Sequence, residues 1–129
     1  MVNSIRYFEE ECINRFEKLE DDFMKEPQKL AEYVLGLTEE LQNLGLRMIQ
    51  ESLEEMNTML RKSKKRLQRW VVESNETKQL ITSLGTVTFK KTLFTNRETG
   101  ESEYLLDRIM GFEKHERISE DAFAKMLKE

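Results

Sequence analysis

Residues that break helices are scarce in this 129-residue sequence, which contains one proline and five glycines. Cysteine and histidine occur once each, as Cys12 and His115, so the chain can form neither an internal disulfide nor a zinc cage of thiolates and imidazoles. No run approaches the roughly 20 apolar residues of a membrane-spanning helix, and the amino terminus lacks the apolar core of a signal peptide. We therefore expect a cytoplasmic protein with no membrane partner, metal or other cofactor, in which Cys12 is a small buried residue.

Apolar residues are also few relative to charge, because hydrophobic residues make up 38% of the sequence and charged residues 36%. This ratio favours elongated helices over a large globule. The sequence contains no glycine-rich phosphate loop, no nucleophile elbow and no pair of metal-binding histidines. Most carboxylates fall on the solvated faces of expected helices, where they usually keep a helix soluble. We thus expect no catalytic residue, no small-molecule substrate and no enzymatic activity in this chain.

The first part of the chain, residues 1–70, is expected to form a helical arm. Apolar residues recur at steps of three or four from Ile5 to Phe23 and predict a helix over about residues 3–24. Pro27 cannot lie inside a helix but suits the first turn of a new one. The first helix is therefore expected to end before Pro27, and a second to begin there.

The second helix is long and is predicted over about residues 27–70. Gly36 and Gly45 lower its helix propensity, so a kink near residues 36–38 is one expectation, with Thr38 able to cap a restarted helix. Without a break the helix would extend for about 65 Å, whereas the first helix reaches only about 30 Å.

An apolar seam with heptad-like spacing runs along one side of the long helix. The first helix is too short to cover the whole seam. A second copy of the chain is the simplest cover, which predicts a homodimer held by a coiled-coil-type contact. Burial of the seam within one chain is the alternative. The expected seam residues are Leu37, Leu41, Leu44, Met48, Leu53, Met56 and Leu60.

A small antiparallel β lobe of three or four strands is expected over residues 71–112. RWVVES and KQLITSL are predicted as two short strands joined by a turn at Asn75 and Glu76, and TVTFKKTLF as the next strand. SEYLL would return as its partner after a turn that contains Gly100, and Gly111 would end the apolar turn DRIMGF.

Residues 113–129 are expected to hold the start of a C-terminal helix from Ser119, which stops after barely three turns, as in a truncated chain. The predicted fold class is therefore α+β and mainly α. It consists of a helical hairpin with one long helix, a small antiparallel sheet and a C-terminal helix.

Positive charge is concentrated in one segment although the net charge is −4. Residues 61–69, RKSKKRLQR, include six basic residues and no acidic one, whereas residues 1–26 carry eight acidic and four basic residues. Such a cluster attracts nucleic acid because each neutralised phosphate releases counterions. The alternative is a solvated face balanced by the acidic first helix. The candidate DNA-binding residues are Arg61, Lys62, Lys64, Lys65, Arg66 and Arg69, together with Lys90, Lys91 and Arg97 of the β lobe.

Several motifs in the second half resemble the amino-terminal region of bacterial insertion-sequence transposases of the Lre type. They are GTVTFKKT at residues 85–92, YLLD at residues 104–107 and ERIS at residues 116–119, with a looser match at RETG, residues 97–100. The resemblance implies a mobile-element protein that recognises the ends of its own DNA and moves it by metal-dependent strand transfer. It also implies that the metal-binding acidic residues lie in a later RNase H-like region, so none is assigned to a position in this sequence.

Two hypotheses about function follow from these observations. The first is a non-catalytic amino-terminal module of a bacterial transposase, which forms a homodimer, helps to hold double-stranded DNA at transposon ends and is associated with the nucleoid. The second is a purely structural, self-associating protein-interaction module without contact to nucleic acid. Salt-dependent binding to duplex DNA distinguishes them.

Overall fold

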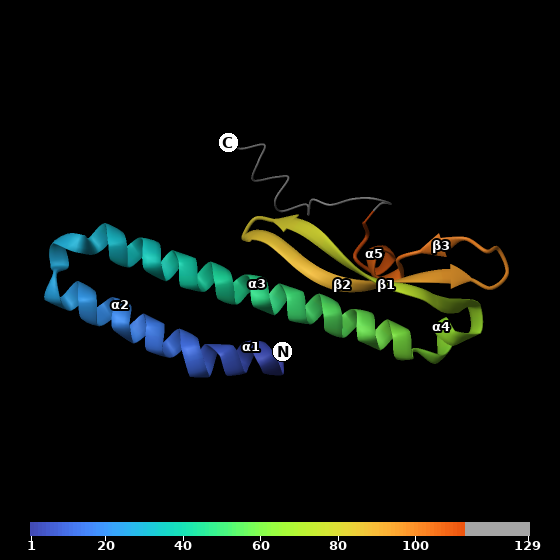
Figure 1. The fold of residues 1–129 in the computed structure, drawn as a ribbon, viewed down its shortest axis with the longest axis horizontal. Helices are drawn as coiled ribbons and strands as arrows, with labels where there is room; N and C mark the ends of the chain where they lie inside the picture. The colour runs from blue at the N-terminus through green and yellow to red at the C-terminus, as the bar shows by residue number, and fades with distance from the viewer. Residues whose placement is uncertain (113–129) are drawn as a thin grey trace. The chain divides into compact units, whose positions relative to one another are not determined.

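The computed structural model describes residues 1–112, apart from the side chains of Lys65 and Leu67. The expected helix from Ser119 lies outside the described residues. The chain forms two compact units, Met1–Glu51 (unit 1) and Ser52–Glu129 (unit 2). The fold class is α+β and mainly helical, as predicted, with a long helix, a three-stranded antiparallel sheet and a short helix after the sheet (Figure 1).

Unit 1 is an antiparallel pair of helical arms. The first arm consists of segments that follow one another directly: α1 (Val2–Tyr7), the π-helical turn η1 (Phe8–Cys12) and α2 (Ile13–Lys25). Glu26 leaves the helical region with φ −133° and ψ 74°, and Pro27 begins the 3-10 turn η2 (Pro27–Lys29). The second arm is the first part of α3 (Leu30–Lys62), which continues into unit 2. Proline thus occupies the helix start where its missing N–H has no cost.

Side-chain contacts show that the two arms are antiparallel, because residue numbers fall along the first arm as they rise along the second. The pairs are Phe23 with Tyr33, Leu19 with Gly36, Arg15 with Glu40, Tyr7 with Arg47, and Ser4 with Glu51. At Gly36, a Cβ atom would lie only 2.6 Å from Cδ2 of Leu19, so the missing side chain permits this close approach. α3 is continuous through Gly36, and the Thr38 hydroxyl donates to the Val34 carbonyl within the helix, 2.9 Å away, instead of capping a restart.

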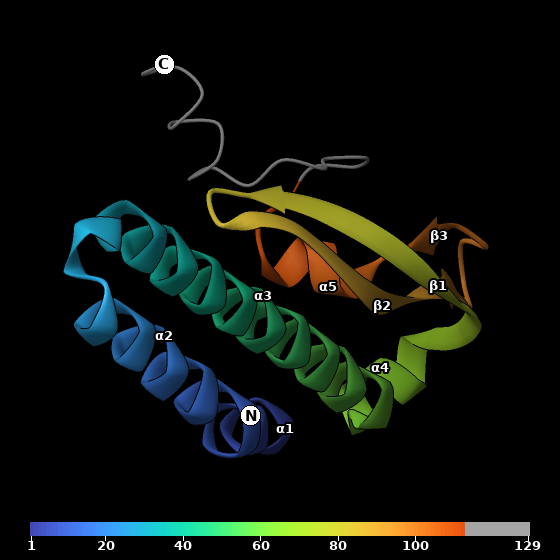
Figure 2. The same ribbon diagram turned by 60° about the vertical axis from the view of Figure 1, so that its left-hand side comes forward.

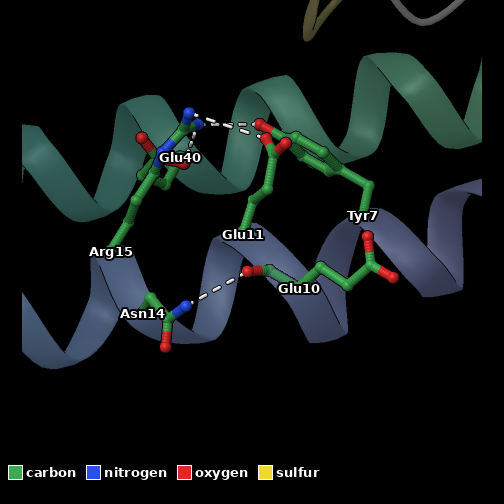
Figure 3. A network of polar contacts seen from close by, with 6 residues as sticks. All are labelled: Tyr7, Glu10, Glu11, Asn14, Arg15 and Glu40. Carbon is green, nitrogen blue, oxygen red and sulfur yellow. Dashed lines mark hydrogen bonds and ion pairs between the residues drawn. The ribbon is translucent and has the colours of Figure 1, made fainter.

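A polar network around Tyr7 joins the two arms (Figure 3). The Arg15 guanidinium donates to the Tyr7 hydroxyl over 3.0 Å and pairs with Glu40 over 3.4 Å. The hydrogen bond to Glu40 raises the pKa of Arg15. Arg47 lies over the Tyr7 ring, 3.9 Å from its centroid. Cys12, in the same arm, is fully buried, as predicted.

Glu51 of α3 caps the start of α1, whose first N–H groups have no partner within the helix. Its Oε2 accepts hydrogen bonds from the backbone N–H and the hydroxyl of Ser4, both over 2.7 Å. Its Oε1 accepts from the backbone N–H of Asn3 over 3.2 Å and contacts the amino group of Met1. Bonds to the amino group and then to Ser4 lower the pKa of Glu51 to about 2.

Unit 2 is built on a long β-hairpin. After α3 come α4 (Lys64–Arg69), β1 (Trp70–Thr82), β2 (Gly85–Asn96), β3 (Ser102–Glu103) and α5 (Leu105–Ile109), and the strand order is β1-β2-β3. Residues 83 and 84 form the turn of the hairpin, where the Thr82 hydroxyl donates to the Gly85 carbonyl over 2.8 Å. Gly85 has φ 136°, in a region that favours glycine.

Both faces of β2 are buried near its carboxyl end. One face carries Val87, Phe89 and Lys91, and Lys91 bonds to Asp107 of α5, whose Leu106 is fully buried. α5 lies beside β2 (Figure 2). The other face carries the fully buried Thr92 and Phe94. Thr92 bonds to Asn57 of α3, and the Phe94 ring lies next to Arg66 of α4. The core of unit 2 is therefore a sheet with helices on both sides.

Side chains of α3 complete the hydrogen bonding of β2 where β3 stops. β3 pairs only with Phe94 and Thr95 of β2, which leaves the earlier part of this strand edge open. Asn57 accepts from the backbone N–H of Thr92 over 3.0 Å and donates to its hydroxyl over 2.9 Å. Glu54 accepts from the backbone N–H of Lys90 over 3.2 Å. An exposed strand edge is prone to wrong pairing, and these two helix residues occupy it.

Several predicted boundaries were wrong. Asn75 and Glu76 do not form a turn but lie inside the single strand β1, where Asn75 accepts a hydrogen bond from the Thr92 hydroxyl over 2.6 Å. The expected strand SEYLL is reduced to β3, because its two leucines begin α5 instead. Gly100 and Gly111 have positive φ, at 75° and 74°, which suits the turn and the helix end predicted for them.

Candidate nucleic-acid interface

The predicted basic run begins where the long helix ends. α3 stops at Lys62 rather than near residue 70, because Ser63 is extended with φ −68° and ψ 130°. The chain then forms the single short helix α4 and enters the sheet at Trp70. The last carbonyls of a helix lack partners within it and must be satisfied from elsewhere.

Arg66 of α4 supplies those partners. Its guanidinium donates to the carbonyls of Leu60 and Arg61 at the end of α3, the first over 3.4 Å, and to that of Trp70 over 3.2 Å. It also lies over the ring of Phe94, 5.4 Å from the centroid. The side chain is buried, and burial, followed by repulsion from Arg61 and Arg97, lowers its pKa. Arg66 thus holds the end of α3 against the sheet and does not point to solvent, so we omit it from the candidate interface.

Five of the predicted cations are exposed and form what we call the basic cluster: Arg61, Lys62, Lys64, Arg69 and Arg97. The fold brings Arg97 to the others, because its backbone N–H donates to the carbonyl of Arg69 over 2.8 Å. Within residues 1–112, no ion pair involves a member of the basic cluster. The positive field of the cluster is therefore not cancelled by a neighbouring carboxylate from this part of the chain.

The two lysines predicted on the hairpin have different environments. Lys91 is buried, pairs with Asp107 over 2.7 Å and lies 4.1 Å from the centroid of the Tyr104 ring, so it is an internal residue. Lys90 is exposed on the opposite face of β2 and remains available to a ligand. We therefore keep Lys90 as a candidate and omit Lys91.

The predicted apolar seam stays partly open to solvent. Leu41, Met48 and Met56 are exposed, at 57%, 40% and 38% of their full surface. The other predicted members, Leu37, Leu44, Leu53 and Leu60, are half-buried. In unit 1 the exposed residues continue toward the start of α3 with Leu30 and Val34. The spacing of Leu30, Val34, Leu41 and Met48 places them on one face of α3, which we call the α3 stripe.

The exposed cations of the basic cluster can bind a polyanion such as the phosphate backbone of a nucleic acid. No group of three or more His, Cys, Asp or Glu side chains in the described residues could hold a metal ion. Arginine and lysine side chains bind phosphates without reading base sequence. Among the helices of residues 1–112, none is long and apolar enough to cross a bilayer.

Sequence reasoning missed the polar residues that organise the site from inside. Asn57 joins α3 to β2 and Arg66 ends α3, yet neither role follows from helical spacing. The available signal was Asn57 itself, a polar residue of low helix propensity among the apolar positions of the seam. Ser63, which interrupts the basic run, was the available signal for the end of the helix.

The chain matches the model of one known protein family. Residues 23–128 match the family model of an uncharacterised protein family, UPF0236, and the chain belongs to this family. A UPF0236 protein of Caldanaerobacter subterraneus subsp. tengcongensis, whose name combines eleven designations, is 32% identical over 120 residues. UPF0236 protein TTE2489 of the same organism is 28% identical over 120 residues. Both matches cover 93% of this chain and 25% of the relative, so the chain spans about a quarter of the length of the curated relatives it matches. No solved structure matches the chain.

Proposed function

We propose that this chain is a non-catalytic, amino-terminal module of a transposase-like protein, which self-associates and helps to hold the DNA at transposon ends. The observation that carries the proposal is the basic cluster, in which five exposed cations have no ion pair with the described carboxylates. Cations of this kind bind the DNA backbone through release of counterions. In this role the basic cluster, with Lys90, holds phosphates, while other parts of the protein recognise sequence and perform the reaction.

The names of the relatives support a mobile element. One relative's name combines eleven designations from a single organism, and another combines four. Such names are what we would expect for a protein encoded by several gene copies, and a transposon that copies itself leaves this pattern. The resemblance of residues 85–92 and 104–107 to Lre-type transposases leads to the same proposal.

Self-association is supported by the α3 stripe, whose four residues are between 40% and 57% exposed. Contiguous exposed apolar residues on a helix favour a protein partner. This observation alone is also what a purely structural interaction module would show, which is the second candidate function. DNA binding decides between the two.

The test is titration of the chain with a short duplex DNA at several salt concentrations. If all five cations of the basic cluster contact phosphates, the logarithm of the association constant should fall against the logarithm of salt concentration with a slope of about −4.5. The triple variant Arg61→Glu, Lys62→Glu and Arg69→Glu should reduce the magnitude of this slope by about 3 and abolish most binding.

A control of equal charge separates the basic cluster from net charge. The variant Arg6→Glu, Lys18→Glu and Lys25→Glu changes three exposed cations of unit 1 and should keep most of the affinity. Equal losses in the two triple variants would refute the assignment of the surface. Affinity no better than about millimolar at low salt would refute DNA contact and leave the structural module as the function.

A further inference from the structure

The outer edge of β1 carries backbone groups that β2 does not use. In an antiparallel ladder, residues alternately point their N–H and C=O groups toward the partner strand and away from it. The N–H groups of Lys90 and Thr92 point away from β1, because they donate to side chains of α3. Their register partners on β1 are Thr77 and Asn75. The backbone groups of Thr77 and Asn75 therefore point away from β2, toward the outer edge.

The same alternation adds Gln79 to this outward row. Asn75, Thr77 and Gln79 are all exposed. No described residue bonds to their outward N–H and C=O groups, in contrast to the β2 edge, which α3 covers. We call these three residues the β1 edge. An open edge of this kind pairs with another extended strand.

We propose that the β1 edge binds the β1 edge of a second copy of the chain, antiparallel, with Thr77 opposite the second copy's Thr77. Charge selects both the occupant and the register. Centred on Thr77, the pairing places Glu76 opposite the second copy's Lys78, and Lys78 opposite its Glu76. Centring on residue 76 would oppose two glutamates, and centring on residue 78 would oppose two lysines. Opposite charges across a strand pair stabilise it, whereas like charges directly opposite destabilise it.

The two charged side chains of each copy share one face of the sheet. Glu76 and Lys78 lie on the face of the sheet next to Tyr104, where Glu76 accepts a hydrogen bond from the Tyr104 hydroxyl. The Lys78 ammonium lies 5.6 Å from the centroid of the Tyr104 ring. On the other face, Asn75 would meet the second copy's Gln79. The three outward residues of each copy would then exchange about six backbone hydrogen bonds, two for each hydrogen-bonded pair.

This contact uses neither the basic cluster nor the α3 stripe, so it stands independently of DNA binding and of association through α3. It assigns to unit 2 a two-fold symmetric interface in which the sheets of two copies become one continuous sheet. Isologous contacts of this type are self-complementary by symmetry.

Disulfide cross-linking tests the register directly. Hydrogen-bonded partners in an antiparallel pair have Cα atoms about 5.5 Å apart, which a disulfide can bridge. Under mild oxidation, Thr77→Cys should form a covalent dimer at least about tenfold faster than the control Thr88→Cys. Thr88 is an exposed threonine on the same sheet face but lies in β2. Cys12 is fully buried and is present in both variants. Equal cross-linking rates for the two variants would overturn the proposal.

Charge reversal gives a second, independent readout by sedimentation equilibrium. In a background with Leu41→Glu, which disrupts the α3 stripe, Lys78→Glu should weaken dimerisation about tenfold. The double variant Glu76→Lys with Lys78→Glu should restore it, because the opposite charges are again paired across the edge. A double variant as weak as the single one would overturn the register, even if the cysteine variants folded poorly. Loss of DNA binding with cross-linking intact would refute only the proposed function.

Discussion

Asn57 offers a sharp test of how α3 is attached to the sheet. Its side chain is only 6% exposed and makes two hydrogen bonds to the fully buried Thr92. Replacement by alanine removes both bonds and leaves the backbone N–H of Thr92 without an acceptor. Each lost bond costs about 0.5–1.5 kcal/mol and an unsatisfied buried donor about 1–3 kcal/mol. Because the two costs overlap, we expect Asn57→Ala to lower the free energy of unfolding by about 2–4 kcal/mol.

Urea unfolding followed by tryptophan fluorescence measures this loss in the right part of the chain. Trp70 is the only tryptophan of the sequence and begins β1 in unit 2. The matched control is Asn43→Ala, an exposed asparagine of the same helix, which should change stability by less than about 0.5 kcal/mol. A loss below about 1 kcal/mol for Asn57→Ala, or equal losses in both variants, would refute the reasoning.

Two further predictions concern the helix ends. Arg66→Lys should lower the free energy of unfolding by about 1–3 kcal/mol, because lysine cannot donate to three carbonyls with a planar fork, whereas the exposed control Arg61→Lys should change it by less than about 0.5 kcal/mol. Equal effects in urea unfolding would show that Arg66 is not the cap of α3. The pKa of Glu51 is lowered from 4.5 to about 2, so its contribution to stability is complete above about pH 4.5 and is lost as pH falls through about 2. The stability advantage of the unmodified chain over Glu51→Gln should therefore shrink over this range, and a difference that does not change with pH would contradict it.

The elements with strong local periodicity were predictable from the sequence. The three- and four-residue spacing of apolar side chains predicted both helical arms, and the alternation in TVTFKKTLF predicted β2. Pro27 correctly marked the junction between the arms. These signals are local, because each depends only on the spacing of side chains within one helix or one strand.

The remaining boundaries depend on contacts between residues distant in sequence. Asn75 is a typical turn residue, yet it lies inside β1. There its side chain accepts a hydrogen bond from Thr92, which is 17 residues later in the sequence. The basic run was recognised as a whole, but which cations face solvent depends on packing. Arg66 turns inward to the carbonyls of α3, and Lys91 turns inward to Asp107. Tertiary contacts of this kind override local propensity.

The guarding of the β2 edge by α3 has a consequence for the order of biosynthesis. Glu54 and Asn57 precede the strand residues that they cover by 36 and 35 positions. A chain made from its amino terminus therefore exposes the end of α3 before β2 leaves the ribosome. The acceptor side chains of Glu54 and Asn57 are therefore already made when β2 emerges. The open edge of a nascent β2 can bond to them before it meets another chain. In a circular permutant with the hairpin ahead of α3, β2 would be made before the acceptor side chains that cover its edge.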